Sequence, residues 1–365
     1  MAINGYPGAV HLSLPVDIMF SSFAEDSGRE ERPFDRTAHL PAKAWPEPAR
    51  LSMVLDRLAA AKRPVLIGGH GVWWSGAESY LEEAGRKLGI PVFNIPYHQK
   101  LLGEECEAYM GLADIHQYHP SKDAFAEADL VLMVGARLDN QMNFGNPPLF
   151  PQSVDLVCIN GSHEEIDFNR AADFALLSDP GAFLQAVIAF GESADFTLPR
   201  DWFDLNRQRR AEWVAKMSAD VDAEAGQPEF GGRIHPLHLA LDVQTAMGNG
   251  DWLVIDGGNT HFWSEIAVNM AGWRGQKLGG IMHPGNYSLL GVGVSFGVSA
   301  KALHPDKNVV VISGDGAFLS GGLSIEAAFQ EATPITVVID NNGGLDCISQ
   351  QQERLFANGQ HFATD

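Results

Sequence analysis

Short apolar runs separated by helical patterns recur along most of the chain. Between residues 46 and 190, a segment with helical spacing, Glu78–Leu88, lies among four apolar runs that predict buried strands. These runs are Pro64–Ile67, Ile90–Ile95, Leu130–Val134 and Val154–Ile159. Strands that alternate with helices form a parallel sheet covered by helices on both faces. The pattern predicts one doubly wound α/β domain over residues 46–190.

The same alternation returns between residues 236 and 365. Apolar runs at Trp252–Ile255, Asn308–Ile312 and Ile335–Ile339 predict strands, and Leu323–Glu331 has the spacing of a helix. The last two strands and the helix between them form a β-α-β unit, so these strands are expected to be parallel. The fold class is therefore predicted as α/β, with two doubly wound parallel-sheet domains.

Three shorter segments complete the predicted organisation. Residues 1–20 contain one alternating run, Ala9–Leu14, which is expected to be the last strand of a domain whose body is missing. Residues 21–45 are polar and charged, and they predict a linker. Residues 191–235 are charged, and the spacing over Trp202–Met217 predicts an interdomain helix followed by a linker.

Composition narrows the classes of partner. A formal net charge of −21 argues against nucleic acid and anionic membranes. No apolar run has the length of a membrane span, and the first residues lack the pattern of a secretory signal. Cys106, Cys158 and Cys347 match no zinc spacing and fit a reducing compartment. We therefore expect a cytoplasmic protein that acts on a small-molecule substrate.

Two glycine-rich loops carry the strongest chemical signal. Gly314-Asp315-Gly316 follows one predicted strand of the β-α-β unit, and Asn341-Asn342-Gly343-Gly344 follows the other. Both loops therefore leave the sheet at its carboxyl edge, where open α/β sheets bind ligands. A carboxylate from Asp315, an amide oxygen from Asn342, a backbone carbonyl and phosphate oxygens form a good ligand set for Mg²⁺. The pair predicts a metal and diphosphate site, whereas either loop alone is also compatible with an ordinary tight turn.

This pair of motifs resembles the signature of thiamine-diphosphate enzymes of the decarboxylase and acetohydroxyacid-synthase superfamily. The resemblance implies that Asp315 and Asn342 bind Mg²⁺ through their side chains and Gly344 through its backbone carbonyl. It also implies that residues 46–190 are the family's middle domain and that residues 236–365 are a truncated thiamine-diphosphate domain. A homodimer or homotetramer is implied for the full-length enzyme.

The resemblance extends to further cofactor contacts. It places the diphosphate end of the cofactor against Gly258, Asn259 and Thr260, where the family often has Gly-Gln-His, and it places the bent cofactor against Leu290. Leu290 is alternatively an ordinary core residue. The complete expected set of cofactor-binding residues is Gly258, Asn259, Thr260, Leu290, Gly314, Gly316, Ala317, Asn342 and Gly344.

Two features of the predicted middle domain leave alternatives open. The stretch Gly135–Pro148 most resembles 2-hydroxyacyl-CoA lyases and oxalyl-CoA decarboxylases, and the resemblance implies that some members bind the ADP part of FAD or coenzyme A in this domain. Arg137 then contacts a nucleotide phosphate, or alternatively it pairs with a nearby carboxylate. Similarly, Gly68–Gly71 contacts a ligand or is only a tight turn. The acidic stretch Gly161–Asp173 is a poor surface for a coenzyme A phosphate.

The expected function is thiamine-diphosphate- and Mg²⁺-dependent cleavage or formation of a C–C bond in 2-oxo acids or 2-hydroxyacyl-CoA-type substrates, by a decarboxylase, lyase or carboligase. An acetolactate-synthase-like carboligase is one alternative, and a non-catalytic cofactor-binding subunit or an inactive fragment is the other. No catalytic residue is assigned, because the family's glutamate lies on the pyrimidine-binding domain, most of which we expect to be absent. His261 and His283 are candidates for proton transfer or for structural hydrogen bonds.

Overall fold

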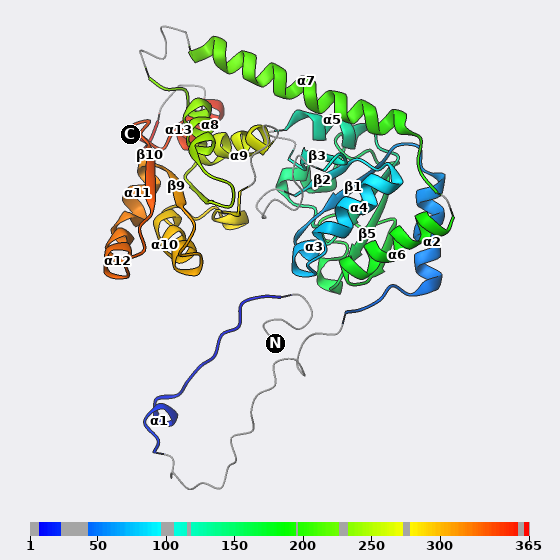
Figure 1. The fold of residues 1–365 in the computed structure, drawn as a ribbon, viewed down its shortest axis with the longest axis horizontal. Helices are drawn as coiled ribbons and strands as arrows, with labels where there is room; N and C mark the ends of the chain where they lie inside the picture. The colour runs from blue at the N-terminus through cyan, green and yellow to red at the C-terminus, as the bar shows by residue number, and fades with distance from the viewer. Residues whose placement is uncertain are drawn as a thin grey trace.

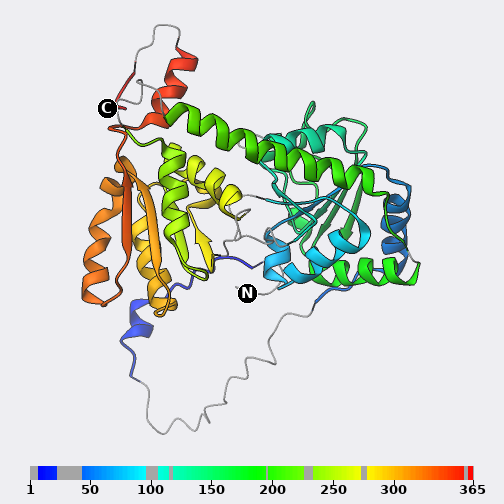
Figure 2. The same ribbon diagram turned by 45° about the horizontal axis from the view of Figure 1, so that its top comes forward.

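The computed structural model describes residues 7–22, 43–95, 106–114, 118–194, 196–225, 233–272, 278–356 and 361–364. Two lobes, each built around a sheet, are joined by one long helix, α7 (Arg200–Ala225), which runs along both of them (Figures 1 and 2). The helix predicted over Trp202–Met217 is confirmed and extends further at both ends. Within the described ranges, every helix is too short or too polar to span a bilayer.

The first lobe contains six parallel strands in the order β3-β2-β1-β4-β5-β6. They are β1 (Pro64–Gly68), β2 (Val92–Asn94), β3 (Tyr109–Leu112), β4 (Leu130–Val134), β5 (Asp155–Asn160) and β6 (Phe174–Leu177). The four predicted strands are confirmed, with small shifts at their ends. Strands β3 and β6 were not predicted, because their short runs contain no β-branched residue.

Helices precede, connect and follow these strands. They are α2 (Pro48–Ala60), α3 (His70–Trp74), α4 (Glu78–Leu88), α5 (His119–Glu127) and α6 (Pro180–Ser193), with 3-10 turns η2 (Asn140–Gly145) and η3 (His163–Glu165). Helix α4 has its predicted bounds: it buries Leu81, Ala84 and Leu88 and ends where Gly89 adopts a left-handed conformation with φ 71°. The strand order runs outward from β1 in one direction and from β4 in the other, which is the doubly wound arrangement.

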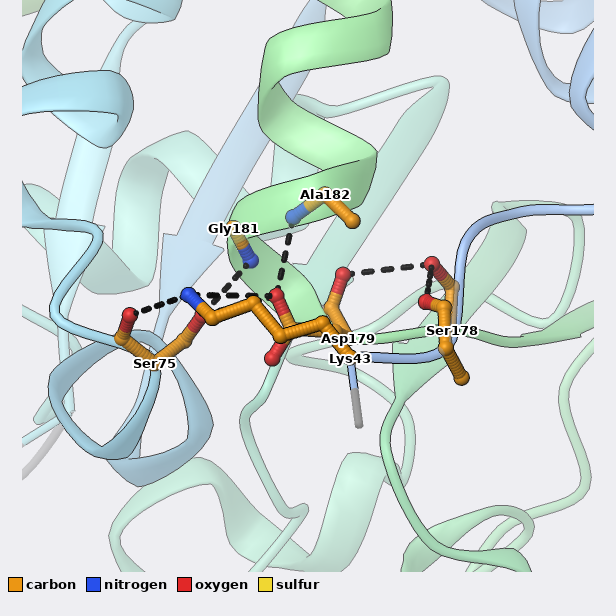
Figure 3. Close-up of polar contacts among 7 residues, drawn as sticks. Lys43, Ser75, Ser178, Asp179, Gly181 and Ala182 are labelled. Carbon is orange, nitrogen blue, oxygen red and sulfur yellow. Dashed lines mark hydrogen bonds and ion pairs between the residues drawn. The ribbon is translucent and has the colours of Figure 1, made fainter. Parts of the chain in front are cut away.

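The chain enters the first lobe through a group of polar contacts at the N-terminus of α6 (Figure 3). Lys43 Nζ donates to the carbonyl oxygen of Ser75 at 2.8 Å, and Ser75 Oγ donates to Asp179 Oδ1 at 2.8 Å. The same Asp179 oxygen caps α6 by accepting from the N–H of Ala182 at 2.9 Å. These contacts fasten the start of the lobe to the first turn of α6.

The second lobe contains four parallel strands in the order β10-β9-β7-β8. They are β7 (Trp252–Asp256), β8 (Gly280–Met282), β9 (Val309–Gly314) and β10 (Thr336–Asp340). The three predicted strands are confirmed as β7, β9 and β10. The β-α-β prediction is also confirmed, because β9 and β10 are adjacent and parallel, with Ile312 paired to Val338.

Helices cover both faces of the second sheet (Figure 2). Leu253 and Ile255 of β7 pack with residues of α8 (Pro236–Ala246) and α9 (Asn259–Gly272), whereas Val254 packs with α10 (Gly293–Leu303) on the other face. The remaining elements are η5 (Gly285–Tyr287), α11 (Asp315–Gly321), η6 (Gly322–Ser324), α12 (Ile325–Gln330) and α13 (Asp346–Leu355). The α/β class with two doubly wound parallel sheets is therefore confirmed.

The connection from β9 to β10 differs from the prediction. A single helix was expected over Leu323–Glu331, but helical structure begins at Asp315, directly after β9, and continues through η6 into α12. The interruption falls at Gly321 and Gly322, and glycine weakens a helix interior. Asp315 therefore lies in the first turn of a helix rather than in an open loop.

The strand predicted over Ala9–Leu14 is wrong. Residues 7–15 form no strand and lie in neither described sheet, and only the short helix α1 (Val16–Met19) follows them. The side chain of Leu12 is 74% exposed. An alternating run becomes a strand only when a neighbouring strand satisfies its N–H and C=O groups. Most of the expected linker, residues 23–42, lies outside the described residues.

Candidate functional site

The residues that follow β9 and β10 meet at the carboxyl edge of the second sheet. Gly314, the last residue of β9, is in register with Asp340, the last residue of β10. Asp315 Oδ2 accepts a hydrogen bond from the N–H of Gly343 at 3.0 Å, and its Oδ1 accepts from the N–H of Gly316 at 2.8 Å. The Asp315 carboxylate therefore bridges the two loops that the sequence predicted to converge.

Oxygen ligands suited to a hard cation gather at this bridge. Asn342 Oδ1 accepts from the N–H of Gly344 at 3.3 Å, and Asp315, Asn342 and Gly344 all line one cavity. A carboxylate, an amide oxygen and a carbonyl oxygen match the preference of Mg²⁺ when phosphate oxygens complete its shell. The set contains a single acid, and the described residues include no group of three or more His, Cys, Asp or Glu placed to hold a metal. The residues fit a metal that is bound together with an anion.

Neighbouring carboxylates make this edge negative. Burial raises the pKa of Asp340, and the charges of Asp315 and Asp346 raise it further. The hydroxyl of Thr260 acts in the opposite direction, because it donates to Asp340 Oδ2 at 2.9 Å. A bound cation would relieve the repulsion among these acids, so the electrostatics of the edge favour a cation.

Two expected cofactor contacts join the loop after β7 to the rest of the site. Thr260 makes the hydrogen bond to Asp340, and Asn259 Nδ2 donates to Asp346 Oδ2 at 2.9 Å, at the start of α13. Both residues lie in the first turn of α9 and line the cavity. Their side chains connect β7, β10 and α13, and their contact with a cofactor stays a prediction.

A cavity of about 830 Å³ opens onto this edge. All the residues predicted to bind the metal or the cofactor line it: Gly258, Asn259, Thr260, Leu290, Gly314, Asp315, Gly316, Ala317, Asn342 and Gly344. Residues of α7 and of the first lobe line it as well, so the cavity lies between the lobes. The tertiary structure therefore gathers the predicted residues into one pocket.

Leu290 belongs to this pocket rather than to the core. Its side chain is 37% exposed and lines the cavity, so the alternative of an ordinary core residue is wrong. The buried carboxylate of Asp256, at the end of β7, accepts from the N–H groups of Gly291 at 3.1 Å and Gly293 at 2.7 Å. Burial raises the pKa of Asp256, and these N–H groups oppose the shift. Asp256 therefore holds the turn that carries Leu290.

Comparison with protein families agrees with this geometry. Residues 51–187 match the family model described as thiamine pyrophosphate enzyme, central domain. Residues 256–365 match the one described as thiamine pyrophosphate enzyme, C-terminal TPP binding domain. The chain belongs to the thiamine pyrophosphate enzyme family. The resemblance seen in the sequence is thereby confirmed, and the second lobe is the part that matches the cofactor-binding domain.

The curated relatives of this chain carry the names of different activities. The chain is 24% identical to a 2-hydroxyacyl-CoA lyase of Oryza sativa subsp. japonica, over 94% of this chain and 58% of the relative. It is 26% identical to an oxalyl-CoA decarboxylase of Escherichia coli K12, again over 94% and 58%. It is 23% identical to a probable acetolactate synthase large subunit of Methanococcus aeolicus, over 99% and 60%. The chain thus spans about three fifths of the length of these curated relatives.

The two candidate histidines have different surroundings in this family member. His261 is buried, lines the cavity, and places its Nε2 3.1 Å from Glu265 Oε1. His283 Nδ1 accepts from the N–H of Gly285 at 3.0 Å, and its ring meets that of His261 edge-on with centroids 5.2 Å apart. His261 is therefore the one that lines the cavity, whereas the contacts of His283 are structural.

In the first lobe, Arg137 pairs with a carboxylate. Its Nε donates to Glu165 Oε2 at 2.6 Å, and its Nη2 donates to Glu165 Oε1. The guanidinium also lies over the ring of Phe168, 4.9 Å from its centroid. Of the two interpretations of Arg137, the structure shows the ion pair.

Several cavity residues were not predicted from the sequence. Asp346 follows the Asn-Asn-Gly-Gly loop by two residues, and an acid so close to that motif was a usable signal. Trp213 and Lys216 come from α7, and Asn140 and Gln141 come from the first lobe. These four residues line the cavity only because the two lobes pack together. A local sequence pattern does not indicate how two lobes pack.

Proposed function

We propose that the second lobe binds thiamine diphosphate through Mg²⁺ at the carboxyl edge of β7, β9 and β10. The observation that carries this proposal is the 3.0 Å hydrogen bond between Asp315 Oδ2 and the N–H of Gly343, because it joins the two halves of the motif. The match of residues 256–365 to a cofactor-binding domain supports the identity of the anion. The negative edge supports the need for a bridging cation.

Each residue of the site would have a distinct task. Asp315, Asn342 and the carbonyl of Gly344 would hold the metal, and the metal would hold the diphosphate. Leu290 would contact the cofactor from the turn that Asp256 fastens to β7. Bound thiamine diphosphate supplies a nucleophilic carbon and an electron sink for reactions next to a carbonyl group. His261, buried beside the cavity and 3.1 Å from Glu265, would be placed to hold or move a proton there.

The proposed reaction is cleavage or formation of a C–C bond in a 2-oxo acid or a 2-hydroxyacyl thioester. The names of the relatives, which include a lyase, a decarboxylase and an acetolactate synthase, support this class and leave the carboligase alternative in place. We further propose a cytoplasmic location, with which the free thiols of Cys106, Cys158 and Cys347 agree, and a homodimeric or homotetrameric full-length enzyme.

Calorimetric titration with thiamine diphosphate, with Mg²⁺ and with EDTA, tests the binding proposal. We expect Mg²⁺-dependent binding that weakens by more than about 100-fold in Asp315→Ala, since even indirect partners of a metal contribute 10- to 100-fold. Asp306→Ala is the matched control, because Asp306 is exposed and precedes β9 at the opposite edge of the sheet. Binding that is equal in the parent, the variant and the control would refute the metal assignment.

Turnover needs a separate test. A non-catalytic cofactor-binding subunit or an inactive fragment would bind the cofactor without decarboxylating 2-oxo acids. We expect residues 1–365 alone to show no turnover above that of free cofactor, and a family pyrimidine-binding domain with its glutamate to restore it when added. Turnover by residues 1–365 alone would contradict the view that this glutamate is needed.

A further inference from the structure

The first sheet has a topological switch point between β1 and β4. The chain proceeds from β1 to β2 and β3 on one side, then returns to place β4, β5 and β6 on the other. Open α/β sheets bind nucleotides outside the carboxyl ends of the strands at such a point. In this lobe the place of such a crevice is bordered by the turn from β1 into α3, at Gly69–Gly71, and by the loop after β4, at Gly135–Leu138.

These two loops are closed onto each other. The N–H of Gly69 donates to the carbonyl oxygen of Val134 at 3.0 Å, and the N–H of Gly71 donates to that of Gly135 at 2.9 Å. A Cβ on Gly69 would lie 2.5 Å from the Cα of Ala136, so the backbones are in direct contact. Nucleotide sites of this fold need free N–H groups to receive a phosphate. Here the N–H groups of Gly69 and Gly71 already donate to carbonyl oxygens of the protein.

The positively charged side chain at this place, that of Arg137, already has an anionic partner. Arg137 forms a two-bond ion pair with Glu165, whose side chain is buried. A phosphate that displaced Glu165 would leave that carboxylate buried without its partner, which is strongly unfavourable. Burial, followed by the charge of Arg137, lowers the pKa of His70 to about 4, so this imidazole is neutral near pH 7 and offers no second cation.

The loop that carries Glu165 is fastened across the crevice. Asn169 Nδ2 donates to the carbonyl oxygen of Leu138 at 2.5 Å, and Arg170 Nη1 donates to that of Gly145 at 2.8 Å. Asp167 and Asn169 adopt positive φ values of 61° and 68°, which persist only where the surroundings impose them. These contacts and backbone conformations therefore fix the loop, and the loop holds Glu165 beside Arg137.

We propose that Glu165 acts as an internal anion that occupies Arg137 and closes the crevice, so that the first lobe does not bind the diphosphate of an adenine nucleotide or of coenzyme A. This inference does not depend on the proposed metal site. It narrows the substrate to molecules that are recognised without a nucleotide contact in the first lobe. It also makes Glu165 a determinant of specificity rather than only a stabilising ion pair.

Calorimetric titration with ADP and with coenzyme A tests this, in EDTA so that no diphosphate binds through Mg²⁺ at Asp315. We expect no binding to the parent at millimolar ligand, and at least tenfold tighter binding to Glu165→Gln, which keeps an acceptor for Arg137 but removes the competing charge. The double variant Arg137→Met/Glu165→Gln should lose this gain. Glu164→Gln is the matched control, because Glu164 is an exposed neighbouring acid.

Three outcomes would overturn the proposal. Parent protein that binds ADP and loses it in Arg137→Met would show that Arg137 takes a phosphate despite Glu165. Glu165→Gln that melts like the parent yet gains no binding would show that another feature closes the crevice. An equal gain in Glu164→Gln would show a general effect of charge.

Discussion

Thr260 Oγ1 donates a hydrogen bond to Asp340 Oδ2 at 2.9 Å and so joins the first turn of α9 to the end of β10. This bond partly offsets the repulsion that Asp340 experiences from Asp315 and Asp346. Neutral donors thus hold together an edge of the sheet whose acids repel one another. The cation that we propose would complete the same arrangement.

Asp340 should make stability fall with rising pH in the absence of metal. Its pKa is raised above 3.8 in the folded protein. Between pH 3.8 and this raised pKa, the folded state therefore binds more protons than the unfolded state. The free energy of unfolding therefore decreases as pH rises through the raised pKa. We expect Asp340→Asn to be more stable than the parent at pH 7 in EDTA and to lose this advantage below pH 3.8, measured by urea unfolding.

The control for Asp340 is Asp306→Asn, which removes one exposed carboxylate at the other edge of the sheet. Mg²⁺ should stabilise the parent more than Asp340→Asn, because the cation relieves a repulsion that the variant lacks. An Asp340→Asn protein no more stable than the parent at pH 7 would contradict the raised pKa.

His70 should make the first lobe sensitive to acid. Burial and the charge of Arg137 lower its pKa from 6.5 to about 4, so between these values the unfolded chain binds a proton that the folded protein does not. Stability is therefore lost as pH falls from 6.5 toward 4, by up to about 3 kcal/mol. We expect His70→Gln to lack this part of the pH dependence, and an NMR titration that placed the His70 pKa near 6.5 would exclude it.

Asp256 should stabilise the turn that carries Leu290. Asp256→Ala leaves the N–H groups of Gly291 and Gly293 without their acceptor, and an unsatisfied buried group such as the Gly293 N–H costs about 1–3 kcal/mol. We expect a loss of unfolding free energy in that range together with weaker thiamine diphosphate binding in Mg²⁺. The exposed Asp242→Ala is the control, with a change within about 0.5 kcal/mol. Unchanged stability and binding in Asp256→Ala would count against the role of this carboxylate.

Much of the second lobe could be predicted because its signals are local. The β-branched runs of β7, β9 and β10 mark buried strands wherever they occur in a sheet. Parallel pairing then places Asp315 and Asn342 at one edge, since a β-α-β connection leaves few other arrangements. The strand predicted over Ala9–Leu14 failed for the converse reason, because alternation indicates a strand only where a neighbouring edge is present.

The α/β class, the family and the two glycine-rich motifs could be predicted from the sequence alone, because periodicity and motif spacing are properties of neighbouring residues. The folded structure was needed to show that Arg137 pairs with Glu165, that Thr260 bonds to Asp340, and that α7 and the first lobe line the cavity at the carboxyl edge of the second sheet. Those pairings join residues far apart in the chain. They depend on strand order, on register and on the packing of the two lobes. Without this information, a polar side chain in a sequence is equally compatible with several partners.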